Sequence, residues 1–212
     1  MKQNTVYNCP GCSTAHKVQL NDATLVICQV CNEIVADNVA DSEKPKAAHI
    51  PDDWSFLQIG TTGVYKEYNF TVIGRLRLQL RNDYKNFWCT TCDGGKCLWI
   101  AESFGSFALF TASWTEVKND LSQLHAGKKV ILANNVTLRG EYVEKCEGIS
   151  YTGEIGPWNL FYPGFFLIQA SNGSGQTAFF TIKKNNRHVL SGQKVTLEEL
   201  NLKNILTWDE WK

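Results

Sequence analysis

The sequence predicts a mostly β protein, in which an N-terminal zinc ribbon precedes a duplicated small β-barrel or sandwich domain with one or two short helices. Three observations favour this class. Four cysteines form two close pairs near the start, the later region is rich in aromatic and β-branched residues, and a glycine-flanked strand pattern occurs twice. We expect a ribbon over 1–35, a linker over 36–53, a first β-unit over 54–112, a connecting helix over 113–125 and a second β-unit over 126–207.

The strongest motif is a pair of C-x-x-C knuckles separated by 15 residues. This is the spacing of a zinc ribbon, in which two tight turns aim four thiolates at one tetrahedral ion. Four protein ligands leave no position for water or substrate, so we expect a structural Zn²⁺. The expected ligands are Cys9, Cys12, Cys28 and Cys31. A thioredoxin-like redox pair and a rubredoxin-type iron site are the alternatives, and Gly11 is expected to supply unusual backbone angles in the first knuckle.

Composition excludes several classes of protein. The 212 residues carry 21 Lys+Arg and 21 Asp+Glu, so the formal net charge is zero and a general polyanion binder is disfavoured. With 12% aromatic residues, a disordered chain is excluded for most of the length. No secretory signal opens the sequence, so the eight cysteines favour metal or free thiols over disulfides and we expect a cytoplasmic protein.

The longest stretch without a charged side chain, residues 155–182, is long enough for a membrane-spanning helix to be considered. Prolines and glycines interrupt it, and its apolar part, residues 158–170, is shorter than the roughly 20 residues that a spanning helix needs. We therefore expect buried strand and turn here. Docking against a membrane surface is the alternative.

The clearest strand covers residues 70–80, where leucines alternate with polar side chains after Gly74. A period of two predicts a half-buried antiparallel strand, and Gly74 predicts a bulge or bend in it. The residues expected to face the core are Leu76, Leu78 and Leu80, and those expected to face water are Arg75, Arg77, Gln79 and Arg81. Further strands are expected near 62–67, 86–92, 97–102, 106–110, 128–133, 136–145, 164–170 and 177–183.

Two capping-box patterns predict short helices, one from Ser113 and one from Thr196. The repeat consists of a leucine-to-glycine tetrapeptide followed by a second glycine 13 or 14 residues later. Its copies are Leu57–Gly60 with Asn69–Arg75, and Leu124–Gly127 with Asn135–Glu141. Two similar β-units explain this pattern, and chance similarity between glycine-flanked strands is the alternative.

The remaining four cysteines are Cys89, Cys92, Cys97 and Cys146. The first three could form a second thiolate site. However, residues three apart on a straight strand point to opposite faces, and a buried free cysteine behaves as a small hydrophobe. We therefore expect packing rather than a second metal.

Several stretches of the chain follow one family's pattern. They are Ile59–Gly63, Tyr68–Arg75, Asp93–Gly105, Glu147–Gly148, Gly153–Trp158 and Leu190–Leu202. With the ribbon cysteines, they resemble an uncharacterised bacterial family, domain-of-unknown-function family 4178. The chain departs from that pattern at Cys89, Cys92 and Cys97, and by insertion of Gly156. The resemblance implies a bacterial cytosolic β-protein without known catalysis, in a membrane-stress context.

Two carboxylates and two indoles occupy motif positions of that family. The candidate pocket consists of Trp99, Glu102, Glu154 and Trp158. Such a pocket could bind a cation by charge and cation–π attraction, or the carboxylates could do acid–base work. We favour the simpler interpretation, in which the tryptophans belong to the core and each glutamate caps a strand or pairs with an arginine.

These observations predict a non-catalytic binding or adaptor module, for which no catalytic residue is assigned. The first 50 residues carry four lysines against five Asp and Glu, and a Zn²⁺ with four thiolates adds about two negative charges. The acidic ribbon favours another protein as partner and disfavours nucleic acid. The alternatives are an enzyme or small-cation binder that uses Glu102 and Glu154, and a nucleic-acid binder that uses the Arg75–Arg81 face.

Overall fold

The protein is described here by a computed structural model that covers residues 1, 3–37, 50–51, 53–93, 96–103, 105–114, 124–157, 163–183 and 186–207. These residues are mostly strand, as the sequence predicts, and they contain one short helix. The strands are β1 (Val6–Asn8), β2 (Ala15–Lys17), β3 (Leu25–Ile27), β4 (Ile34–Asp37), β5 (Thr62–Tyr65), β6 (Tyr68–Leu80), β7 (Tyr84–Cys92), β8 (Lys96–Ser103), β9 (Ser106–Trp114), β10 (Lys129–Ile131), β11 (Thr137–Ile155), β12 (Phe166–Ser171), β13 (Gln176–Lys183) and β14 (Asn186–Val195), and the helix is α1 (Leu197–Leu200). No helix among the described residues has the length and apolarity needed to cross a membrane.

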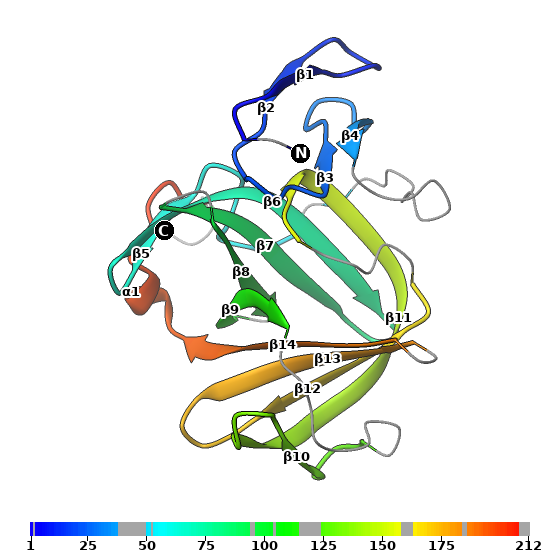
Figure 1. Cartoon of the computed structure of the whole chain (residues 1–212), viewed down its shortest axis with the longest axis vertical. Coiled ribbons are helices and arrows are strands. Elements are labelled where there is room, and N and C mark those ends of the chain that lie inside the picture. The colour runs from blue at the N-terminus through cyan, green and yellow to red at the C-terminus, as the bar shows by residue number, and fades with distance from the viewer. Residues whose placement is uncertain are drawn as a thin grey trace.

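The main sheet curves into a ring of antiparallel strands (Figure 1). The ring runs β6–β7–β8–β9–β14–β13–β12–β11 and returns to β6. The 19-residue strand β11 closes it, because its first half pairs with β12 and its second half pairs with β6. The last three residues of β11 also pair with β3, so the second hairpin of the ribbon continues the same sheet.

The two halves of the ring repeat one strand order, as the internal sequence repeat predicts. In each half a short strand, β5 or β10, precedes a four-stranded meander, β6–β9 or β11–β14. Each short strand follows a glycine in the left-handed region, Gly60 with φ of 94° and Gly127 with φ of 84°. The leucine three positions earlier, Leu57 or Leu124, is buried in both copies.

Three apolar clusters match this duplicated architecture. The largest fills the ring, takes residues from every ring strand and includes Trp99, Phe87 and Tyr151. A second cluster lies outside the first half, where α1 adds Leu200. A third lies outside the second half around Phe180. Ribbon residues join only the largest cluster, so the ribbon covers one end of the ring.

Strands β6 and β11 approach each other closely where Gly74 pairs with Gly153. A Cβ on Gly74 would lie 2.0 Å from the carbonyl oxygen of Glu154, and Gly153 has a φ of 72°. The register of the β6–β7 pair also shifts between Val72 and Gly74, which confirms the predicted irregularity. The two glycines therefore allow the closure of the ring.

Most predicted strands are present, with changed ends, and three strands, β1, β4 and β14, were missed. The strand expected near 136–145 extends to Ile155. The Thr196 capping box is confirmed, because the Thr196 hydroxyl accepts from the N–H of Glu199 and the Glu199 carboxylate accepts from the N–H of Thr196. Of the helix expected over 113–125, residues 115–123 lie outside the described part, and Ser113 belongs to β9 instead.

Candidate functional sites

The four ribbon cysteines lie on two turns of matching geometry. The first turn links β1 to β2, and the second links β3 to β4. In each turn the residue after the second cysteine adopts a left-handed conformation, Ser13 and Asn32 both with φ of 62°. The prediction that Gly11 supplies the unusual backbone angles was therefore wrong, because Ser13 and Asn32 supply them. Gly11 supplies space instead, because a Cβ there would lie 2.8 Å from Cγ of Glu33.

The four sulfur atoms converge within 4.8 Å of one another. Sγ of Cys9 lies 3.4 Å from Sγ of Cys31, and Sγ of Cys12 lies 3.5 Å from Sγ of Cys28. A tetrahedral ion with Zn–S bonds of about 2.3 Å needs sulfur atoms about 3.8 Å apart. The cluster can therefore bind a metal ion, and its four sulfurs suffice to fill a tetrahedral shell.

Protonation of the metal-free cluster is uneven. The hydroxyl of Thr14, 3.2 Å from Sγ of Cys12, lowers the pKa of that thiol to about 6. At Cys31, the backbone of Glu33 lowers the pKa, but burial and the neighbouring thiols outweigh it and raise the pKa to about 12. Four adjacent thiolates repel one another, so a divalent cation is needed to hold all four ionised together.

Glu154 joins the ribbon to the ring. Its carboxylate accepts backbone N–H bonds from Gln19 at 2.8 Å and from Leu20 at 2.7 Å. Burial raises the pKa of Glu154, and these two amide donors act in the opposite direction. Next to it, the hydroxyl of Thr24 donates to the carbonyl of Gly156 at 2.6 Å. The hydrogen bonds of Glu154 therefore connect the ribbon to the strand that closes the ring.

Glu102 has a different set of partners on the other side of the ring wall. It accepts hydrogen bonds from the hydroxyl of Ser55 at 2.6 Å and from the indole N–H of Trp88 at 2.8 Å. None of its described partners is shared with Glu154, so two separate sets of groups bind the two carboxylates. Trp99 is fully buried inside the ring, and Trp158 lies outside the described residues.

The prediction that Arg75 and Arg77 face water was wrong. They are 8% and 7% exposed, and both guanidinium groups bind the carboxylate of Asp53. Arg75 also stacks on the ring of Trp88, 4.5 Å from its centroid, and each arginine donates through Nε to the side-chain carbonyl of Asn86. The chain entering the first β-unit covers this face, so these arginines are not available to a nucleic acid.

The other cysteines do not assemble a second four-thiolate site. Sγ of Cys89 lies 3.4 Å from Sγ of Cys97 inside the ring, whereas Cys92 packs in the cluster outside it. Cys146 contacts the carbonyl of Gly148 instead. Across the described residues, the ribbon cysteines are the one group of three or more potential ligands close enough for a metal. Opposite-facing strand positions explain the separation, as predicted.

A polar cavity at the opposite end of the ring was missed by the sequence reasoning. It has a volume of about 370 Å³, and its lining includes Lys85, Tyr142, Lys194 and Glu141. One feature of the sequence could have indicated this cavity. Lys85 stands two residues before Phe87 on an otherwise well-packed strand, so it faces the same side of β7 as that phenylalanine.

Comparisons of the chain with protein-family models, with curated proteins and with solved structures found no match. The resemblance to family 4178 therefore stays a prediction. The features of the chain that bear on its function are the ribbon and the cavities of the ring.

Proposed function

We propose that the protein is a non-catalytic binding module whose N-terminal ribbon folds around a structural Zn²⁺. The observation that carries this proposal is the convergence of four cysteine sulfurs within 4.8 Å. Four thiolates suit Zn²⁺ and complete its shell, so the ion would stabilise the ribbon and leave no position for a substrate. A segment this short cannot bury enough apolar surface to fold alone, which gives the metal a clear role.

The partner that we propose is another protein, bound by the ribbon. Two apolar side chains stand in solvent there: Val6 on β1 is 58% exposed, and Val30 in the second knuckle is 69% exposed. The β1–β2 hairpin projects away from the ring, where a partner can reach it (Figure 1). We further propose a cytoplasmic location, and a membrane-stress context on the strength of the family resemblance alone.

The metal is tested by elemental analysis of the purified chain. We expect about one zinc per chain, and loss of that zinc in the Cys28→Ser variant. The matched control is Cys92→Ser, which removes a thiol outside the ribbon and should keep the zinc. Iron in place of zinc, recognised by its visible absorption, would contradict the zinc proposal, and a metal-free wild-type chain would contradict any metal site.

The partner is tested by affinity capture from cells with a double variant, Val6→Lys with Val30→Lys. We expect wild type to retain one defined protein and the double variant to lose it. Ile131→Lys is the control, because Ile131 is an exposed apolar residue of β10, away from the ribbon. Equal capture by both variants would contradict a ribbon-mediated contact. Retention on lipid vesicles without a protein partner would favour the membrane alternative instead.

A further inference from the structure

The polar cavity lies at the end of the ring away from the ribbon. Its lining residues come from seven of the ring strands, β7, β8, β9, β11, β12, β13 and β14, including both sides of the β8–β9 turn. Polar groups and aromatic rings share the wall, since Ser103, Ser106 and Gln169 line it together with Phe107 and Phe179. A volume of about 370 Å³ is in the range of small-molecule sites.

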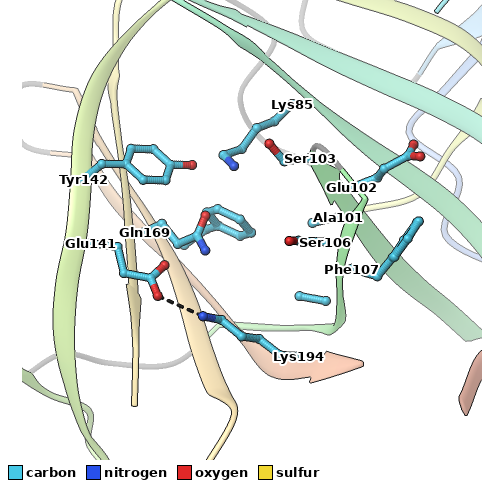
Figure 2. A pocket seen from close by; sticks show the side chains of 12 residues that line it. Lys85, Ala101, Glu102, Ser103, Ser106, Phe107, Glu141, Tyr142, Gln169 and Lys194 are labelled. Atoms are coloured by element: carbon cyan, nitrogen blue, oxygen red, sulfur yellow. Dashed lines mark hydrogen bonds and ion pairs between the residues drawn. The ribbon is translucent and has the colours of Figure 1, made fainter. Parts of the chain in front are cut away.

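Lys85 places an ammonium group deep in this cavity. Lys85 is 6% exposed, and its Nζ lies 4.9 Å from the ring centroid of Tyr142 and 5.8 Å from that of Phe179. Figure 2 shows the side chains of Lys85 and Tyr142 pointing toward each other. No carboxylate among the described residues is within ion-pair distance of it. Burial lowers the pKa of Lys85, while Asp83, Glu141 and Glu144 raise it through space. These three carboxylates act on the ammonium group only from a distance, so Lys85 is a buried cation without a directly bound counter-ion, which is costly to bury.

The other charged groups of the lining already have partners. Nζ of Lys194 lies 2.8 Å from the carboxylate of Glu141, and both side chains are partly exposed at the mouth. Glu102 is held by Ser55 and Trp88, as described above. By contrast, the hydroxyl of Tyr142 is buried and has no hydrogen-bond partner. Lys85 and Tyr142 therefore offer one ammonium group without a carboxylate in contact and one hydroxyl without a hydrogen-bond partner, and both point into the cavity (Figure 2).

We propose that this cavity binds a small amphipathic monocarboxylate, whose carboxylate lies between Nζ of Lys85 and the hydroxyl of Tyr142 and whose apolar part packs on Phe179. A carboxylate compensates one positive charge and accepts both donors. A dianion such as a phosphate monoester would bring a second negative charge near the carboxylate of Glu141, which lines the same cavity. This binding function is separate from the ribbon and does not depend on the zinc.

The test compares three eight-carbon probes that differ only in their head group. The zinc-loaded full chain is titrated with octanoate, 1-octanol and octylammonium, and the heat of binding is measured by calorimetry. We expect the Kd for octanoate to be lower than the Kd for either of the other two probes by about tenfold or more. Lys85→Met should weaken octanoate by a similar factor and leave 1-octanol unchanged. Lys145→Met is the matched control, because Lys145 lies exposed on the same strand as Tyr142, and it should bind octanoate as wild type does.

Three results would overturn the proposal. The first is that wild type binds octanoate and 1-octanol equally well. The second is that folded Lys85→Met binds octanoate as tightly as wild type does. The third is that wild type does not bind octanoate up to millimolar concentration. If Lys85→Met does not fold, the head-group comparison on wild type still decides the question. In addition, Ala108→Phe places a bulky ring in the cavity from β9 and should abolish octanoate binding.

Discussion

The carboxylate of Glu154 accepts a hydrogen bond of 2.7 Å from the backbone N–H of Leu20. Glu154 belongs to the long strand that closes the ring, and Leu20 lies between the two metal-binding turns. The side chain of Leu20 is fully buried in the interior cluster, at the end of the ring that the ribbon covers. This bond therefore holds the ribbon at the place where it packs on the ring. The ribbon and the ring are thus joined by a polar contact as well as by packing.

Glu154→Gln should loosen the ribbon without removing the fold. The amide nitrogen of glutamine would face the N–H of Gln19 where a carboxylate oxygen now accepts at 2.8 Å, so a donor would oppose a donor. We expect a loss of about 1–2 kcal/mol in the free energy of unfolding. Hydrogen exchange at the amides of Gln19 and Leu20 should become faster, and a chelator should extract the metal sooner.

The control for this variant is Glu147→Gln, which changes an exposed glutamate on the same strand. It should leave exchange at Gln19 and Leu20 as in wild type. Unchanged exchange in Glu154→Gln as well would show that packing alone holds the ribbon.

Features encoded in short stretches were predictable from the sequence. The C-x-x-C spacing identified the cysteines that converge, because each knuckle is a local turn. Leucine alternation identified the inward face of β6 for the same reason. On the outward face, Gln79 and Arg81 are exposed as predicted. Arg75 and Arg77 were misjudged because their partner is Asp53, which lies 22 and 24 residues away in a segment whose composition indicates only a linker.

The cavity and β14 were missed for related reasons. The cavity takes its lining from seven strands, so no continuous stretch of sequence carries its pattern. Lys85 is a charged residue that points inward, against the usual hydrophobic alternation. In β14, Leu190 is followed by Ser191, Gly192 and Gln193, so the strand lacks a regular apolar period and depends on pairing with β9 and β13.

Asp53→Asn should destabilise the first half of the ring. The change removes the carboxylate that binds two buried guanidinium groups, which costs roughly 3–5 kcal/mol. Burial acts to raise the pKa of Asp53, but Asn86, Arg75 and Arg77 outweigh it and hold the pKa below its usual 3.8. The stabilisation by Asp53 is therefore complete above about pH 4 and is lost as the pH falls through the lowered pKa.

Urea denaturation between pH 3 and pH 7 measures this effect. The stability difference between wild type and Asp53→Asn should be largest near neutral pH and should shrink on the acid side. Asp93→Asn, at an exposed position, should change the stability little at any pH. A difference that does not vary with pH would contradict an ionised Asp53 in the folded state.

Gly74→Ala should interfere with closure of the ring. The added methyl group would meet the carbonyl of Glu154 at 2.0 Å, and neither backbone can move without disturbing the β6–β11 pair. We expect a loss of about 3 kcal/mol, measured by urea denaturation. Gly173→Ala is the control, because a Cβ there meets nothing within 4 Å, and it should behave as wild type.

Binding of Zn²⁺ by the ribbon should release protons and strengthen with pH. In the metal-free site the pKa of Cys31 is about 12, so Cys31 is a thiol at neutral pH and must lose its proton to bind the ion. Cys12, with a pKa of about 6, is already ionised there. Release of at least one proton means that the apparent affinity should rise about tenfold or more for each pH unit near neutrality.

Competition with a chromophoric chelator between pH 6.5 and pH 8.5 measures this slope. Cys31→Ser should weaken binding and also lower the slope by about one proton, because the group that releases it is gone. Cys92→Ser should change neither quantity. A wild-type affinity that stays constant over this range would mean that Cys31 is ionised before the metal binds, and would contradict the raised pKa of Cys31.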